Sequence, residues 1–208
     1  MISEETIGGF LERLAAGKAT PGGGAAAAIQ AAQAAALISM AANFTTGPRF
    51  ADHERDARRI ARLASDLIPQ SLALADDDER AFARVASAYE LPKESETERG
   101  ARSGVIQDAL REAVRPPKKL IQITRSILAL GEELAGFANP DVRSDIAAAL
   151  EAARSAAAGA RATLAADRAD ITDGKIAGTL QGPAADAEEI IESCGRLSEQ
   201  LRTQIREG

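Results

Sequence analysis

Apolar residues recur every three or four positions along most of the chain, which is the spacing of one face of an α-helix. The pattern begins with Ile7, Phe10, Leu11 and Leu14, with Ser3 as the candidate cap of that helix. No segment alternates between apolar and polar residues for long enough to form a convincing strand. The pattern therefore predicts an all-α fold.

Glycine, proline and capping residues indicate where the helices begin and end. Ser95 and Glu98 fit a capping box, and Pro116 and Pro117 suit the first turn of a helix. After the first helix, the expected helices cover residues 25–44, 52–89 with a bend or break near Pro69, 95–114, 116–137, 139–166 and 183–207. Residues 171–182 are expected to be irregular. We expect a single domain of long packed helices over residues 1–208.

Alanine dominates the composition and sharpens this prediction. The chain has 47 alanines, no tryptophan, one tyrosine and five phenylalanines. Alanine is the best helix former, and the poverty of aromatic and β-branched residues argues against a sheet. Because alanine side chains bury little area each, we expect a second subunit to complete the core, as a homodimer or a higher homo-oligomer.

Charge and cysteine content exclude several classes of function. The formal net charge is −6, and the scarcity of aromatic rings makes nucleic acid an unsuitable partner. One cysteine and one histidine allow neither an intrachain disulfide nor a common zinc site, so no metal is expected. Segment 25–44 is apolar but mostly alanine and is interrupted by polar residues, which predicts a buried helix and no membrane span. Nothing near Met1 resembles a secretory signal, so we expect a cytoplasmic protein.

Asp78 is the most informative single residue. Helical spacing places it on a mostly apolar stripe with Leu67, Ser71, Leu74, Phe82, Val85 and Tyr89. Burial of a carboxylate raises its pKa toward the range useful for proton transfer. The alternative is a buried aspartate satisfied by an arginine or a helix end. Asp76 and Asp77 fall on other faces, where we expect water to solvate them.

Three weaker motifs lie elsewhere in the sequence. The run Thr20 to Gly24 before the alanine-rich helix suits the approach of a ligand to backbone N–H groups, or a plain turn between close-packed helices. Positive charge gathers in a segment that suits a carboxylate ligand or forms a solvated face: Lys93, Arg99, Arg102, Arg111, Arg115, Lys118 and Lys119. Asn139, Ser144 and Asp145 lie around a helix start, where each is also a normal capping residue.

In their order along the chain, these pieces resemble the cyclodeaminase/cyclohydrolase family of one-carbon folate metabolism, over roughly residues 5–173. The resemblance rests on Pro21-Gly22-Gly23-Gly24, Met40, Asn43-Phe44-Thr45, Asp78 with Ala81-Phe82, Leu91-Pro92-Lys93, Arg102 with Ile106-Gln107 and Ala109, Pro116, Asn139 and Ser144-Asp145. It implies an all-helical homodimer with a folate site near the subunit interface, without metal or separate cofactor.

The resemblance also implies roles for individual residues. Asp78 matches the catalytic aspartate of the family. The implied substrate-binding residues are Pro21, Gly22, Gly23, Gly24, Asn43, Thr45, Lys93, Arg102, Asn139, Ser144 and Asp145. The implied reaction is hydrolysis of 5,10-methenyltetrahydrofolate to 10-formyltetrahydrofolate. The second candidate is cyclodeamination of 5-formimidoyltetrahydrofolate with release of ammonia; because these 208 residues include no formiminotransferase domain, hydrolysis is the first choice.

The sequence departs from the family pattern at three places. Ala25 replaces the usual serine and Ala138 the usual glycine, and the family signature Asn-Val-x-x-Asn here runs from Thr163 to Asp167. A site built for hydrogen bonds tolerates unmatched groups poorly. Two further hypotheses follow: an enzyme acting on another cyclic amidine or imine, and a helical folate-binding scaffold without turnover.

Overall fold

The protein was analysed as a computed structural model that describes residues 1–207, and these residues form helices and no strand. The helices are α1 (Ile7–Ala15), α2 (Gly23–Asn43), α3 (Glu54–Tyr89), α4 (Glu96–Ala113), α5 (Arg115–Ala135), α6 (Arg143–Asp170), α7 (Gly174–Gly178) and α8 (Gln181–Glu207). Three short 3-10 helices are η1 (Ile2–Glu4), η2 (Pro48–His53) and η3 (Pro140–Val142). The expectation of an all-α fold is confirmed.

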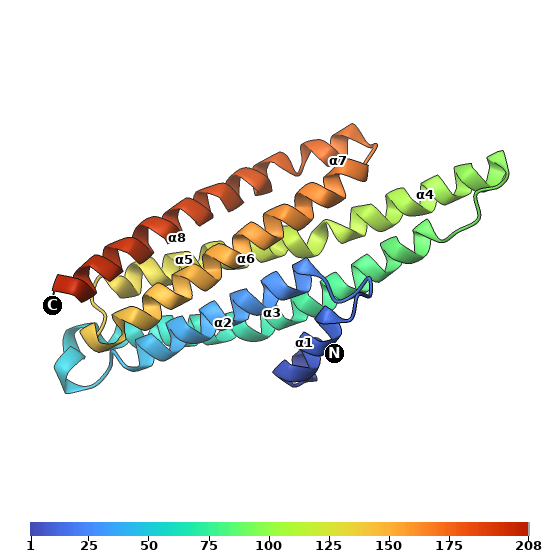
Figure 1. The fold of residues 1–208 in the computed structure, drawn as a ribbon. Coiled ribbons are helices and arrows are strands. Elements are labelled where there is room, and N and C mark those ends of the chain that lie inside the picture. The colour runs from blue at the N-terminus through green and yellow to red at the C-terminus, as the bar shows by residue number, and fades with distance from the viewer. Residues whose placement is uncertain (208) are drawn as a thin grey trace.

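The long helices lie side by side in an elongated bundle (Figure 1). Helix α2 packs against α3, α5 and α6, while α8 covers α6 and α5 from the outside. The C-terminal part of α3 and the start of α4 form a hairpin that extends beyond the rest of the bundle (Figure 1). The short helix α1 lies on the outside, next to α3 (Figure 1).

Alanine lets the helices around α2 approach closely. Eleven residues of α2 are buried, and nine of them are alanines. At the contact with α6, a Cβ atom added to Gly159 would lie only 2.8 Å from the Cβ atom of Ala27. Among residues 1–207, α2 is the helix long and apolar enough to cross a membrane by length and composition, and just over half of its most apolar stretch is buried in the bundle.

The caps of the helices are partly those that the sequence predicts. The capping box of α4 is confirmed: the Ser95 hydroxyl accepts from the backbone N–H of Glu98, and the Glu98 carboxylate accepts from the backbone N–H of Ser95. The prediction that Ser3 caps the first helix is wrong, because Thr6 caps α1 by accepting from the N–H of Gly9. Ser3 lies in η1 instead, where its hydroxyl donates to Asp76.

Three further expectations need correction. Helix α3 is not broken at Pro69: it continues through this residue, which lies on an exposed side where water can satisfy the carbonyl left without a donor. Asp76 is not solvated: it is 7% exposed, and it accepts from the backbone N–H of Ile2 at 2.5 Å, which ties the N-terminus to α3. Residues 171–182, expected to be irregular, contain the short helix α7 and the first residues of α8.

Candidate functional site

The first turn of α2 and the middle of α3 meet at Asp78. The Asp78 side chain is 9% exposed and fills the space beside Gly24. A Cβ atom added to Gly24 would lie 2.1 Å from Oδ1 of Asp78, much closer than atoms can approach. The backbone of Gly22, Gly23 and Gly24 does not adopt positive φ, so Gly24 is needed here for space and not for conformational freedom.

Burial controls the chemistry of Asp78. Loss of solvation raises the pKa of its carboxyl group to about 6, and the backbone N–H of Ala25 opposes part of this rise. The sequence analysis considers an arginine or a helix end as the partner of a buried aspartate. The structure provides the helix end, through the backbone N–H of Ala25 in α2. Asp78 forms no ion pair with any residue from 1 to 207. A carboxylate with this pKa can accept a proton near neutral pH and release it again.

A second buried carboxyl group lies on α6. Asp167 is 6% exposed, and its Oδ2 atom has no hydrogen-bond partner. Burial and the negative charge of Asp78 raise the pKa of Asp167 to about 6. Helical spacing places Asp167 on the same buried stripe as Ala160 and Leu164. The resemblance to the family identifies this position as a departure, but only the structure shows that Asp167 is buried and that one of its carboxyl oxygens has no partner.

The surface next to Asp78 has a narrow crevice and a wider groove. The crevice is lined by residues of α2, α3, α5 and α6, including Gly24, Asp78 and Pro116, and it has no room for a water molecule. The groove, of about 240 Å³, shares Pro116 with the crevice. Four cations line this groove: Arg80, Arg84, Arg115 and Lys119. A ligand that reacts at Asp78 therefore lies at the mouth of the crevice, with cations to one side.

Two of the four groove cations are already paired. Arg80 bonds to Asp77, and Arg115 bonds to Glu112 at 2.9 Å. Arg84 and Lys119 form no ion pair with the residues that the structure describes. The sequence pattern places Arg115 and Lys119 in a basic segment, whereas Arg80 and Arg84 are not among the candidate residues that it indicates. Only the packing of α3 against α5 shows that the four share one groove.

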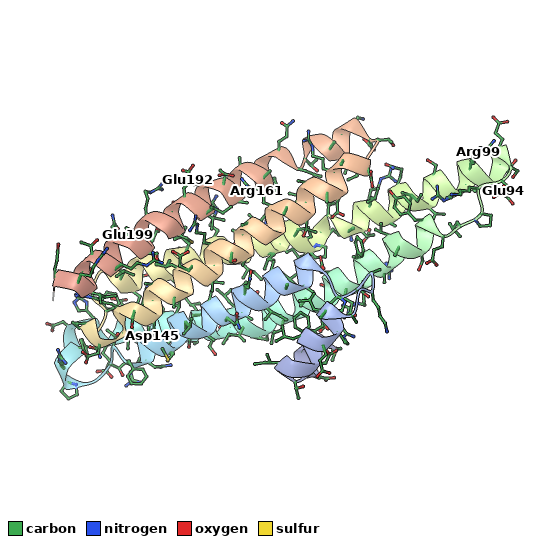
Figure 2. The ribbon with its side chains drawn as sticks, viewed as in Figure 1. Glu94, Arg99, Asp145, Arg161, Glu192 and Glu199 are labelled. Carbon is green, nitrogen blue, oxygen red and sulfur yellow. The ribbon has the colours of Figure 1, made fainter. Side chains whose placement is uncertain are left out.

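Two predicted substrate-binding residues lie elsewhere, at the α3–α4 hairpin. Lys93 is exposed in the loop between the two helices, next to Glu94 at the tip of the hairpin (Figure 2). Arg102 donates to the backbone carbonyl of Tyr89 and lies over its ring, 5.4 Å from the centroid. At 1.5 Å per helical residue, Tyr89 is roughly 16 Å along α3 from Asp78. Within one chain, Lys93 and Arg102 are thus outside contact distance of Asp78.

The remaining predicted residues gather at the opposite end of the bundle. The side-chain amide of Asn139 donates to the carbonyl of Phe44, its backbone N–H donates to the Thr45 hydroxyl, and its side-chain oxygen accepts from the N–H of Asp141. Asn43 and Ser144 are exposed near these residues, and Asp145 is partly exposed at the start of α6 (Figure 2). The length of α2 separates this end from Gly24 by roughly 30 Å.

Apart from Lys93 and Arg102 at the α3–α4 hairpin, the sequence-predicted residues therefore form two groups in one chain. The Asp78 group comprises Pro21, Gly22, Gly23, Gly24 and Asp78, with the groove cations beside it. The Asn139 group comprises Asn43, Thr45, Asn139, Ser144 and Asp145. Residues 1–207 contain no group of three or more His, Cys, Asp and Glu side chains arranged to hold a metal ion.

Comparison with known proteins decides the family. Residues 6–186 match the sequence profile described as formiminotransferase-cyclodeaminase. The chain belongs to this family. The matched region begins where the resemblance predicts and extends beyond residue 173, through α7 and into α8.

Individual members of the formiminotransferase-cyclodeaminase family are similar over most of the chain. A methenyltetrahydrofolate cyclohydrolase from Methylorubrum extorquens is 38% identical over 151 residues, which are 72% of this chain and 73% of the relative. The formimidoyltransferase-cyclodeaminase of Mus musculus is 35% identical over 173 residues, 83% of this chain but only 32% of the mouse protein. This chain thus corresponds to about a third of the mouse protein.

A solved structure agrees with the fold over the full length. The crystal structure of formiminotetrahydrofolate cyclodeaminase from Thermotoga maritima superimposes with a TM-score of 0.87 and 27% identity, and the match covers 99% of each chain. The family assignment therefore rests on the sequence profile, on sequence relatives and on the arrangement of the helices.

Proposed function

We propose that this protein hydrolyses 5,10-methenyltetrahydrofolate to 10-formyltetrahydrofolate, with Asp78 as the acid/base residue. The observation that supports this most is the buried carboxyl group of Asp78, held against the first turn of α2 with a pKa of about 6. The 38% identity to a named methenyltetrahydrofolate cyclohydrolase supports the same reaction. No metal or cofactor is needed in this proposal.

The proposed chemistry uses one proton carrier. The bridging carbon of the substrate belongs to an amidinium-like cation, which a nearby carboxylate stabilises. Asp78 takes a proton as water forms a bond to that carbon. The proton then moves to N5 as the bond between carbon and N5 breaks. The new hydroxyl group gives its proton back to Asp78 as it becomes the formyl oxygen, and one proton leaves to solvent.

Cyclodeamination is the second candidate, favoured by the match to the Thermotoga maritima cyclodeaminase over 99% of both chains. N10 would attack the formimidoyl carbon, and the leaving ammonia would take its proton from Asp78. Two assays of the purified protein separate the candidates: loss of methenyltetrahydrofolate absorbance above the spontaneous rate, and release of ammonia from 5-formimidoyltetrahydrofolate. Activity in neither assay would contradict the proposal and favour the binding role.

The groove cations suit the glutamate end of a folate. If Arg84 and Lys119 bind its carboxylates, then Arg84→Ala and Lys119→Ala each raise KM by up to roughly fivefold, at about 1 kcal/mol per exposed contact, and leave kcat nearly unchanged. Lys118→Ala is the matched control, because Lys118 adjoins Lys119 but does not line the groove. Steady-state kinetics on methenyltetrahydrofolate measure the effect. An unchanged KM in both variants would place the glutamate elsewhere.

We also propose that the protein works as a cytoplasmic homodimer in which the Asn139 group of one subunit meets the Asp78 group of its partner. The separation of roughly 30 Å within one chain supports this, because one reacting carbon cannot contact both groups. Phe82, Tyr89 and Leu91 leave apolar surface exposed near the α3–α4 hairpin, as a subunit contact requires. The unpaired, buried Cys194 suits a reducing compartment.

Mixing two inactive variants tests the shared site. One variant is Asp78→Asn and the other combines Ser144→Ala with Asp145→Ala. In a mixed dimer, one site loses both groups and the other is intact. Random exchange of subunits is expected to restore about a quarter of wild-type activity, since half of the dimers are mixed and each has one intact site. Mixtures that stay at the average of the separate variants, although sedimentation shows mixed dimers, would contradict the shared site.

A further inference from the structure

A third groove adjoins the crevice of Asp78. It runs between α3 and α5, has a volume of about 530 Å³, and is referred to as the amide groove because Gln70 and Gln122 line it. Leu74 lines both the amide groove and the crevice. Lys119 lines both the amide groove and the groove of the four cations. The crevice therefore opens between two continuous grooves on one face of the protein.

The two grooves extend from the crevice in opposite directions along α3. The groove of the four cations is lined on α3 from Asp77 to Arg84, and the amide groove from Leu67 to Asp77. A folate is divided in the same way, because its reacting carbon bridges N5 of the pterin and N10 of the p-aminobenzoylglutamate half. With this carbon at the crevice and the glutamate at the cations, the pterin enters the amide groove. This step rests on the proposed function.

The amide groove offers the walls and the length that a pterin requires. Leu67, Leu74 and Ile123 present apolar side chains to the faces of a ring. Gln122 lies roughly 9 Å beyond Pro116 along α5, which is the scale of a bicyclic ring with its substituents. A further groove between α3 and α4 shares no residue with the crevice, so a pterin bound there would hold N5 away from Asp78.

Both glutamines have hydrogen-bonding atoms to spare. The Gln122 side chain is exposed and forms no hydrogen bond with residues 1–207, so its oxygen and its nitrogen are both available. The Gln70 nitrogen donates to a backbone carbonyl of its own helix at 2.8 Å, which leaves the side-chain oxygen as an acceptor. The Ser126 hydroxyl is engaged, since it donates to the backbone carbonyl of Gln122 at 3.2 Å.

We propose that the amide groove is the pterin subsite and that Gln122 binds the edge of the pterin. This edge presents the N–H of N3 beside the carbonyl oxygen at C4, with an amino group at C2. A carboxamide carries an acceptor and a donor side by side, so Gln122 accepts from N3 and donates to the carbonyl. Gln70 accepts from the amino group. The apolar side chains between them cover the faces of the ring.

The two halves of a folate test this assignment separately. The probes are 6-hydroxymethylpterin and p-aminobenzoylglutamate, whose dissociation constants are measured by NMR titration, and intact folic acid, measured by calorimetry. Gln122→Leu is expected to weaken binding of the pterin and of folic acid roughly tenfold, the usual loss for two neutral hydrogen bonds, and to leave p-aminobenzoylglutamate unchanged. Arg84→Ala should do the opposite to the two halves. Gln33→Leu is the matched control, because Gln33 is an exposed glutamine on α2 that lines neither groove.

The outcomes separate this inference from the proposed function. If Gln122→Leu selectively weakens the pterin but wild-type protein shows no turnover, the proposed reaction is wrong and the subsite stands. If methenyltetrahydrofolate is hydrolysed and Gln122→Leu leaves its KM unchanged, the reaction stands and the subsite is wrong. Equal weakening of both halves by Gln122→Leu would also overturn the subsite, and a lowered unfolding temperature of that variant would identify structural damage as the cause.

Discussion

Asp78→Asn is expected to reduce kcat for methenyltetrahydrofolate hydrolysis by roughly 10²–10⁴-fold, the usual contribution of a general acid/base residue. The amide keeps the size of the side chain beside Gly24 but cannot accept the proton of water. Asp66→Asn is the control, because Asp66 is an exposed aspartate on the same helix. Hydrolysis is followed by absorbance, with the spontaneous rate subtracted. Activity within twofold of wild type would contradict the role of Asp78.

The same variant is expected to be more stable than the wild type at neutral pH. Asp78 has a folded-state pKa of about 6 against an ordinary value of 3.8, so the ionised side chain costs stability once the pH rises above the ordinary value. The full difference corresponds to roughly 3 kcal/mol, at 1.36 kcal/mol per pH unit. The Asn variant should therefore unfold several degrees higher than wild type at pH 8, and the gap should close near pH 4. A lower unfolding temperature at pH 8 would show that the lost activity reflects damage.

Gly24→Ala is expected to reduce kcat at least tenfold, because its new Cβ atom would lie 2.1 Å from Oδ1 of Asp78 and must displace the carboxylate. Gly23→Ala is the matched control: it adds the same atom one residue earlier, where the Cβ has no neighbour within 4 Å. Alanine also favours helices over glycine, so intrinsic propensity cannot explain a loss. Steady-state kinetics of the two variants and the wild type measure the effect, and wild-type activity in Gly24→Ala would show that Asp78 moves aside without consequence.

The helices could be predicted from the sequence because their signals are local. Apolar spacing, the capping box at Ser95 and the prolines at the start of α5 act within a few residues of themselves. Thr6 and not Ser3 caps α1, while Ser3 and the backbone N–H of Ile2 bond to Asp76, a contact between residues more than seventy positions apart. No local pattern contains such information, and the burial of Asp76 was missed for the same reason.

In the candidate site, too, features set by neighbouring residues could be predicted from the sequence, and features set by the packing of distant helices could not. Periodicity alone placed Asp78 on a mostly apolar stripe, and its burial is confirmed. The reason for Gly24 became visible only when α2 and α3 were placed together. The separation of the Asn139 group from Asp78 follows from the length and direction of α2, which a motif read in order along the chain does not reveal.

The alanine contacts around α2 also limit how this protein can change during evolution. The spacing of α2 from α6 is set by Cβ atoms and backbone, so a larger side chain at Ala27 or Gly159 would push the helices apart. Such a shift would carry Gly24 away from Asp78 and disturb the carboxylate. New substrate preferences are therefore accessible mainly through residues at the rim, such as Arg84 and Lys119, which can be exchanged without moving a helix.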